Sequence, residues 1–268
     1  MSKLKLIRCS TIPLSLNIFC KGLLEHLSQD YEVVALSSPG KDLDEVRIRE
    51  GVRTIGVAME RKISLWRDLL SLLRLIAVFR RERPDVVHSM TPKAGLLCML
   101  ASKLTGVPVR IHTFTGLVFP TVSGWKQKIL IATDRITCWC ATHVIPEGEG
   151  VKNDLLKYGI TSKPLQVLGY GNIRGIDLNY YRCDESIQGQ AQEIRQRYDN
   201  AFIFLYVGRI LNEKGIRELV GAYKRFDEQH ANSRLLLVGP IDTQGGLDSE
   251  TSSMILEHPH IEQIGFLP

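Results

Sequence analysis

Short apolar runs of strand length alternate with longer amphipathic segments along the whole chain. Nothing but polar intervals and turns separates these two kinds of segment. The apolar runs predict ten strands, at 4–9, 31–37, 52–57, 85–90, 109–114, 142–147, 165–169, 202–208, 234–239 and 261–266. The amphipathic segments predict helices near 17–28, 42–50, 64–83, 93–105, 124–140, 149–158, 214–229 and 248–257. Continuous apolar strands separated by helices are typical of a parallel sheet covered on both faces, so we expect an α/β fold.

One polar stretch, "CDESIQGQAQEIRQRYDNA" at 183–201, interrupts this alternation. We expect no strand in it, and the strand pattern restarts immediately afterwards. It therefore predicts two domains, 1–182 and 183–268. The first would hold about seven strands of a doubly wound sheet, while the second has only three predicted strands. Since a nucleotide-binding unit of this type has about six strands, the second sheet is expected to be incomplete.

Composition and charge narrow the class of protein only a little. The chain has 268 residues, 44% of them hydrophobic and 24% charged, as in soluble globular proteins. Its net charge of +5 fits an anionic substrate, a nucleic acid or an acidic membrane surface. We expect no nucleic-acid partner, because basic and aromatic residues do not gather in one module. We also expect neither a signal peptide nor a transmembrane helix, which predicts a cytoplasmic protein.

The six cysteines lie mostly inside apolar segments and form no CxxC pair. This pattern indicates reduced, buried thiols. The "CWC" at 138–140 has no second Cys or His pair nearby, so we expect no metal site.

The segment "VGRILNEKGI" at 207–216 follows a predicted buried strand and precedes a helical pattern. Ligands of open α/β sheets bind beyond the carboxyl ends of the strands, where Arg209 and Lys214 are expected to lie. Gly208 would let the backbone approach a diphosphate, Arg209 would offer a fork of donors and Lys214 a point charge. We expect Asn212 to cap the following helix. The alternative is an ordinary basic loop exposed to solvent.

The same segment, "VGR…NEKG", resembles the donor-site motif of family 4 retaining glycosyltransferases, which have the GT-B fold. Two further segments match the family in order and spacing. "ERPDVVHSMTPKAGLLCMLASKLTGVPVRIHTFTG" at 82–116 is similar to the strand, helix, strand and glycine turn of the first domain. "GYGNIRGIDLNYY" at 169–181 is similar to the connection between the domains. The resemblance covers the whole chain and is closest to the branch that builds capsule, O-antigen and related glycans.

The resemblance implies two Rossmann-like domains that face each other across a cleft, the first on the acceptor side and the second binding the donor. It implies a hexosyl- or N-acetylhexosaminyltransferase that uses a nucleotide sugar, with UDP expected, and that retains the anomeric configuration. The acceptor would be a polyprenyl-diphosphate-linked or other saccharide, and no metal or other cofactor would be required. Arg209, Lys214 and Gly208 would hold the donor diphosphate. Other candidates for the cleft are Ser10, Thr11, Gly116 and Asn172. For Ser10 and Thr11, the alternative is a loop in which Ser15 caps a helix.

Two departures from the family pattern stand out. Thr115 occupies the position where many members carry a histidine that lines the cleft. His112 lies three residues earlier and would face the other way in a strand, so we expect a core role for it rather than a catalytic one. The family's Glu-x7-Glu motif is absent at its usual place. Glu185 and Glu193 have the right spacing, but they precede the "VGR" strand and are treated as a coincidence.

The chain thus resembles a glycosyltransferase that lacks its final third. Two alternatives stay open beside an active enzyme. One is an inactive fragment or interaction protein of the same fold, and the other is a sugar-nucleotide epimerase with the GT-B architecture.

The segment "RKISLWRDLLSLLRLIAVFRRERP" at 61–84 has more apolar residues than one buried stripe needs. Arg67, Arg74 and Arg81 recur every seven residues and share one helix face. Together with Trp66, they predict a helix that lies on an anionic membrane, so the protein would be peripheral on the inner face. "SGWKQK" at 123–128 would add a second contact. The alternative is a core helix with a solvated arginine face.

Overall fold

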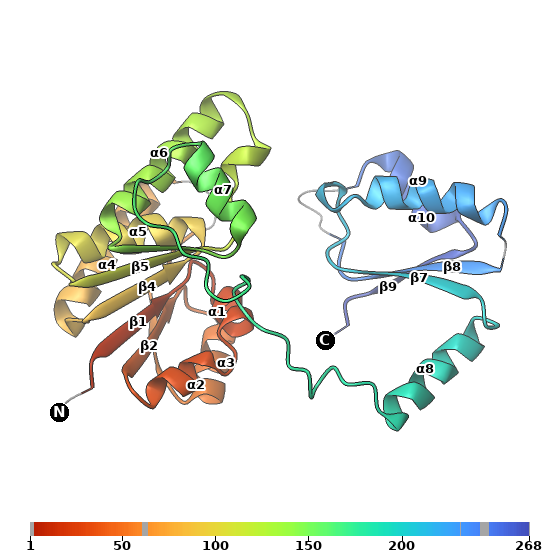
Figure 1. Cartoon of the computed structure of the whole chain (residues 1–268), viewed down its shortest axis with the longest axis horizontal. Helices are drawn as coiled ribbons and strands as arrows, with labels where there is room; N and C mark the ends of the chain where they lie inside the picture. Colours follow the sequence, from red (N-terminus) through yellow and green to blue (C-terminus); the bar gives the residue numbers. More distant parts are fainter. Residues whose placement is uncertain (1–2, 61–63, 231, 242–246, 268) are drawn as a thin grey trace. The chain divides into compact units, whose positions relative to one another are not determined.

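The computed structural model describes residues 3–60, 64–230, 232–241 and 247–267. The chain forms two compact units, Met1–Ile176 and Asp177–Pro268 (Figure 1). The predicted boundary at 182/183 lies within the second unit.

The first unit is built on a six-stranded parallel sheet with the order β3-β2-β1-β4-β5-β6. β2 and β3 therefore lie to one side of β1, and the later strands β4, β5 and β6 lie to the other, as in doubly wound folds. The strands are β1 (Lys5–Cys9), β2 (Glu32–Ser37), β3 (Arg53–Gly56), β4 (Val86–Met90), β5 (Val109–Phe114) and β6 (His143–Pro146).

Six of the seven strands predicted for this unit are confirmed, and the one at 165–169 is wrong. No strand is assigned to these five residues, although all of them are described. Residues 161–168 alternate between partly exposed and exposed, which is the pattern of an extended segment with no partner strand. The apolar run "LQVL" is too short and too exposed to add a strand to the sheet, and Leu168 is 57% exposed.

Helices cover both faces of this sheet (Figure 1). They are α1 (Pro13–Phe19), α2 (Leu23–Ser28), α3 (Lys41–Glu50), α4 (Leu65–Glu82), α5 (Pro92–Leu104), the 3-10 turn η1 (Phe119–Thr121), α6 (Gly124–Cys140) and α7 (Glu149–Lys157). The single helix predicted at 17–28 is wrong, because Gly22, with a φ of 76°, separates α1 from α2. The predicted Ser15 cap is also wrong, since α1 begins at Pro13 and Ser15 lies inside it.

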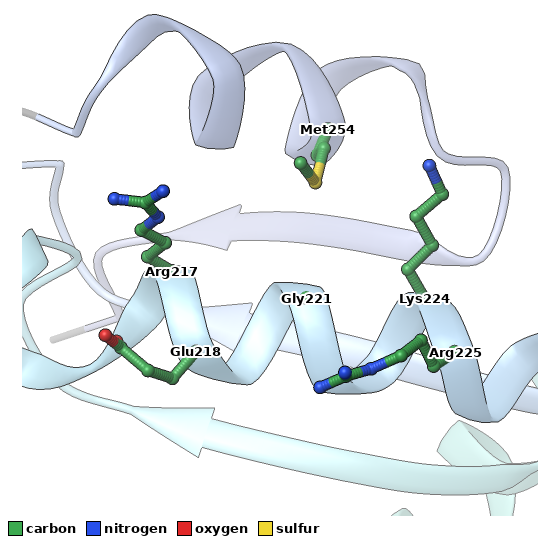
Figure 2. A pocket seen from close by; sticks show the side chains of 6 residues that line it. All are labelled: Arg217, Glu218, Gly221, Lys224, Arg225 and Met254. Atoms are coloured by element: carbon green, nitrogen blue, oxygen red, sulfur yellow. The ribbon is translucent and has the colours of Figure 1, made fainter.

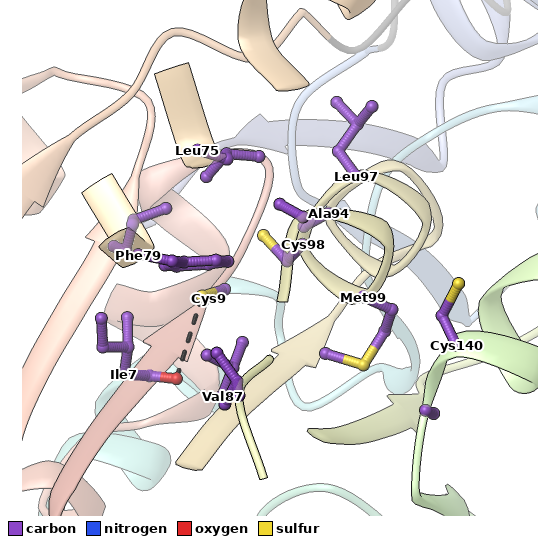
Figure 3. Close-up of a cluster of buried hydrophobic side chains, with 14 of the residues drawn as sticks. Ile7, Cys9, Leu75, Phe79, Val87, Ala94, Leu97, Cys98, Met99 and Cys140 are labelled. Atoms are coloured by element: carbon purple, nitrogen blue, oxygen red, sulfur yellow. Dashed lines mark hydrogen bonds between the residues drawn. The ribbon is translucent and has the colours of Figure 1, made fainter. Parts of the chain in front are cut away.

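Alternating residues of the central strands fill two apolar clusters, one on each face of the sheet. Ile7 and Cys9 of β1 belong to one cluster, while Leu6 belongs to the other. Figure 3 shows Ile7 and Cys9 beneath residues of α4 and α5, among them Phe79 and Cys98. Five of the six cysteines are buried free thiols, as predicted, and Cys183 is exposed.

The second unit holds a three-stranded parallel sheet of order β7-β8-β9. Its elements are α8 (Glu185–Arg197), β7 (Phe202–Val207), the 3-10 turn η2 (Asn212–Lys214), α9 (Ile216–Asp227), β8 (Ser233–Val238), α10 (Ser249–Glu257) and β9 (Ile261–Gly265). Helix α8 occupies the polar stretch that interrupts the strand pattern. Asp184 caps it by accepting a hydrogen bond from the Ile187 amide at 3.1 Å.

One apolar cluster holds this second unit together. It joins α9 and α10 to one face of the sheet, through residues such as Ile216, Val220 and Leu235. The other face of β7 is open within the described residues, since Leu205 and Val207 are 62% and 71% exposed. None of the described helices is both long and apolar enough to cross a membrane.

Candidate functional site

The carboxyl end of β7 lies directly against the carboxyl end of β8. The Gly208 amide donates to the Val238 carbonyl at 2.9 Å, and the Ile210 amide donates to the Pro240 carbonyl at 2.9 Å. The backbones are so close here that a Cβ at Gly239 would lie 1.9 Å from the Gly208 carbonyl oxygen. Glycine is therefore required at 239, and it fixes the course of the loop that begins at Gly208.

Arg209 and Lys214 lie on this loop, and both side chains are exposed. Between them, Ile210 and Leu211 are buried, so the loop is anchored in the core while its two cations face solvent. The Tyr206 hydroxyl donates to the Arg209 carbonyl at 2.8 Å and further fixes the loop. Two positive charges on a firmly held loop at a strand's carboxyl end form a candidate oxyanion site.

The start of α9 adds backbone donors to the same loop. Asn212–Lys214 form the turn η2, Gly215 has a φ of 74°, and α9 begins at Ile216. The Leu219 amide donates to the Gly215 carbonyl, so the amides before it belong to the first helical turn, where intrahelical partners are lacking. The prediction that Asn212 caps this helix is wrong, because Asn212 lies in η2 and the left-handed Gly215 precedes the helix instead.

Ser10 and Thr11 lie at the carboxyl end of β1, but their side chains serve the fold. Ser10 is fully buried, and its hydroxyl donates to the Ile12 carbonyl at 3.0 Å. The Thr11 hydroxyl accepts from the Ala94 amide at 3.0 Å and pairs with the Thr91 hydroxyl at 2.8 Å. These bonds tie the loop after β1 to the first turn of α5, so both hydroxyls already have partners within the first unit.

Gly116 and Asn172, two other predicted residues, are brought together at the carboxyl ends of β5 and β6. Glu147 lies between them. Its amide donates to the Phe114 carbonyl at 3.1 Å, and its own carbonyl accepts from the Asn172 amide at 2.5 Å. The Glu147 carboxylate reaches toward Gly116, where an added Cβ would lie 3.9 Å from Oε1. Thr115 directly precedes Gly116 and is partly exposed.

Glu147 was not among the residues predicted from the sequence. The signal was present, since an acidic residue ends the apolar run "THVIPE" and precedes a glycine. What the sequence could not show is that the turn at Gly116 and the loop at Asn172, 31 and 25 residues away, fold onto it.

His112 lies in the core, as predicted. It is 1% exposed, and its Nδ1 pairs with the Ser89 hydroxyl at 2.8 Å. Burial, helped by the nearby charge of Arg8, lowers the pKa of His112 to about 3, so the ring is neutral at physiological pH. α5 packs so closely over the ring that a Cβ at Gly95 would lie 2.4 Å from its Cε1. This imidazole is a packing element and not a surface group.

The helix predicted to lie on a membrane is α4, and its outer face is apolar and basic. The leucines and the tryptophan of this face are 41–86% exposed: Leu65, Trp66, Leu69, Leu70 and Leu73. Arg67 forms an ion pair with Glu60, and Arg81 forms one with Glu82 at 3.4 Å. Arg74 is exposed on the same helix. The buried side of α4 is narrow and consists of Ser71, Leu75 and Phe79.

A second cationic surface lies between α9 and α10, outside the loop that carries Arg209. It is a shallow cavity of about 450 Å³ whose lining includes Arg217, Lys224 and Arg225 (Figure 2). No residue between Gly208 and Gly215 lines it. Within the ranges that the structure describes, no group of three His, Cys, Asp or Glu side chains is arranged to hold a metal ion.

Two family models match the chain, one in each unit. The glycosyl transferase 4-like domain matches residues 17–171, and the model for glycosyl transferases group 1 matches residues 188–268. The chain is 30% identical over 267 residues to the capsular polysaccharide biosynthesis glycosyltransferase CapM of Staphylococcus aureus. That match covers 97% of the chain and 68% of CapM.

A second relative matches a shorter part. The chain is 28% identical over 155 residues to the Escherichia coli UDP-Gal:alpha-D-GlcNAc-diphosphoundecaprenol alpha-1,3-galactosyltransferase, which is 58% of the chain and 39% of that enzyme. Among solved structures, Anabaena Alr3699/HepE in complex with UDP and glucose matches with a TM-score of 0.72 and 15% identity. This match covers 98% of the chain and 70% of the Anabaena protein, and it confirms the expected GT-B fold class. With two glycosyltransferase models covering its two Rossmann-like units, the chain belongs to the glycosyl transferase 4-like family and is a glycosyltransferase.

Proposed function

We propose that the protein transfers a sugar from a UDP-sugar to a lipid-linked or other saccharide acceptor in the synthesis of a capsule or related surface polysaccharide, with retention at the anomeric carbon. The observation that carries this proposal is the loop from Gly208 to Gly215. It presents Arg209 and Lys214 at the carboxyl end of β7, against the first turn of α9, in a chain of glycosyltransferase sequence.

The loop suits the diphosphate of a nucleotide sugar. When the bond between the anomeric carbon and the diphosphate oxygen breaks, the leaving UDP takes the electron pair and negative charge grows on its terminal phosphate. Arg209, Lys214 and the first amides of α9 would stabilise that charge, and each well-placed group contributes a few kcal/mol. Because this charge comes from side chains and backbone, we expect activity without an added metal ion.

The donor and acceptor classes follow the relatives. The Anabaena protein was crystallised with UDP and glucose, and the E. coli relative is named for UDP-galactose and a GlcNAc-diphospholipid. CapM of S. aureus is named for capsular polysaccharide biosynthesis. These names support a hexosyl- or N-acetylhexosaminyltransferase that acts on a polyprenyl-diphosphate-linked sugar, with the first unit on the acceptor side.

Calorimetric titration with UDP tests the donor site. We expect Lys214→Ala to weaken UDP binding by about 10- to 100-fold, since a hydrogen bond to a charged group contributes about 1.5–3 kcal/mol. Lys224→Ala is the matched control, because Lys224 is an exposed lysine that lies on α9 beyond the loop and lines the cavity of Figure 2. Equal UDP affinity of the wild type and Lys214→Ala would show that this loop is not the diphosphate site.

The products distinguish the two enzyme classes that share this fold. A transferase releases UDP and a lengthened acceptor, whereas an epimerase converts one UDP-sugar into its epimer without any acceptor. We expect UDP release only when acceptor is present. A chain that binds UDP but forms neither product would be the inactive form of the same fold.

We also propose that α4 attaches the protein to an anionic membrane surface. Leu65, Trp66, Leu69, Leu70 and Leu73 offer an apolar face long enough to enter the headgroup region, and the arginines beside them suit acidic lipids. The exposed Trp125, in the segment 123–128, would add a second contact with the membrane. A lipid-linked acceptor lies in that surface, so attachment would bring the enzyme to its substrate.

A further inference from the structure

Glu147 is a carboxylate at the carboxyl edge of the first sheet, and it has no side-chain partner among the residues that the structure describes. It directly follows β6, and its backbone is held from both sides by the Phe114 carbonyl and the Asn172 amide. Its side chain is partly buried, yet no described residue donates a hydrogen bond to the carboxylate or forms an ion pair with it. Burial without such a partner raises the pKa of Glu147 above its ordinary value.

Glu50, in the same unit, shows how a carboxylate with a structural role is surrounded by hydrogen-bond donors. Glu50 is buried and accepts hydrogen bonds from the amides of Gly22, Leu24 and Glu25, at 3.0–3.3 Å. Arg49 donates to it at 2.7 Å. These donors outweigh the cost of burial, and the pKa of Glu50 is lowered. Glu147 is only partly buried, but no described group donates to its carboxylate, so the fold does not account for its charge.

Two glycines in the left-handed region lie next to Glu147. Gly116 has a φ of 119°, in the region that favours glycine, and any side chain there would contact Oε1. Gly171 has a φ of 89°, and a Cβ there would lie 2.8 Å from the Glu147 carbonyl oxygen. Two loops therefore approach Glu147 through glycines, one beside its carboxylate and one against its carbonyl oxygen.

We infer that Glu147 binds the acceptor saccharide by accepting hydrogen bonds from its hydroxyl groups. This inference rests on the proposed function, which puts the acceptor on the first unit. A sugar hydroxyl would supply the hydrogen-bond donor that no described protein group provides. A partly desolvated carboxylate accepts such hydrogen bonds strongly. Because the bonds require a hydroxyl at a particular place, Glu147 selects which saccharide is accepted.

The experiment compares Kd values of the full chain for one acceptor probe, N-acetylglucosaminyl diphosphate carrying a short alkyl chain, in calorimetric titrations. We expect Glu147→Ala to weaken binding by about 10-fold or more, and Glu147→Gln, which keeps the size but not the charge, by a smaller factor. Glu149→Gln is the matched control, because Glu149 lies two residues away, is exposed and pairs with Lys152. It should bind like the wild type.

The same samples are titrated with UDP, which binds the second unit in the proposed function. UDP affinity should stay within twofold of wild type for Glu147→Ala, and an unchanged circular-dichroism spectrum and unfolding temperature would show that its first unit is folded. Unchanged acceptor binding by Glu147→Ala would overturn the inference. So would tighter binding, because it would put the carboxylate against the diphosphate instead of the sugar. If the wild type binds UDP but does not bind the acceptor probe, the inference about Glu147 is also overturned. If the wild type fails to bind UDP, the proposed function itself is contradicted.

Discussion

Replacing Gly239 with alanine should disrupt the loop that carries Arg209 and Lys214. The added Cβ would lie 1.9 Å from the Gly208 carbonyl oxygen and 2.7 Å from its carbonyl carbon, and both are backbone atoms. A side chain cannot rotate away from such a clash, so the ends of β7 and β8 must separate. The φ of 141° at Gly239 adds strain for any L-residue. Overpacking and strain of this kind cost about 2–5 kcal/mol together, which is a large part of the stability of a small unit.

Hydrogen exchange measured by mass spectrometry localises this effect. A loss of about 2–5 kcal/mol speeds exchange through the affected opening by roughly 30- to 5,000-fold, so peptides from β7 and β8 of Gly239→Ala should exchange much faster than in the wild type. Peptides from β1 and β4 serve as an internal reference in the same sample. The variant should also bind UDP more weakly, because Arg209 directly follows Gly208 on the displaced backbone.

Gly221→Ala is the matched control for this substitution. Gly221 lies inside α9, and an added Cβ would meet no atom within 4 Å. Alanine there should stabilise the helix by about 0.5–1 kcal/mol, since it is the better helix former. If Gly239→Ala exchanges at the wild-type rate in β7 and β8, the close approach of the two strand ends does not hold the loop, and the reasoning is refuted.

Two further predictions concern the first unit. Burial raises the pKa of Asp134 to about 7, so the folded chain binds this proton more tightly than the unfolded chain does. The free energy of unfolding should therefore fall by about 2–4 kcal/mol as the pH rises from about 4 to about 7. When it is measured by urea unfolding at several pH values, Asp134→Asn should lack this fall. The same dependence on pH in the wild type and the variant would contradict the prediction. In flotation with anionic vesicles, a variant with Arg67, Arg74 and Arg81 all changed to glutamate should no longer float with the lipid. Equal flotation of this variant and the wild type would contradict the proposed membrane contact.

The fold was predictable from sequence wherever a strand is buried on both faces. Runs such as "KLIRC" and "VVHSM" are nearly continuous in apolar residues because helices cover both sides of the sheet, and the predicted strands match β1 and β4 closely. The secondary-structure predictions failed where the local sequence pattern does not determine the tertiary contacts. "LQVL" has the composition of a strand but no partner, and α8 is a helix without a buried face, so no apolar stripe marked it.

The candidate sites were predictable to a smaller degree. Arg209 and Lys214 stood out because a glycine and an apolar strand precede them, although β7 has no buried residue in the structure. Ser10 and Thr11 are also at a strand end, but their hydroxyls are occupied by the Ile12 carbonyl and the Ala94 amide, and sequence spacing does not show such partners. Glu147 was missed for the opposite reason. It stands out because no described residue pairs with its carboxylate, and the sequence does not show this.

The central claim is that the loop from Gly208 to Gly215 binds the diphosphate of a UDP-sugar. Amide chemical shifts measured by NMR during a titration with UDP test it most directly. The account predicts that the largest shifts fall on Gly208, Arg209, Lys214, Gly215 and the first amides of α9, because the phosphates would lie against the loop that these residues form. Shifts confined to the cavity of Figure 2, at Lys224 and Arg225, or no shift in the loop at saturating UDP, would contradict it.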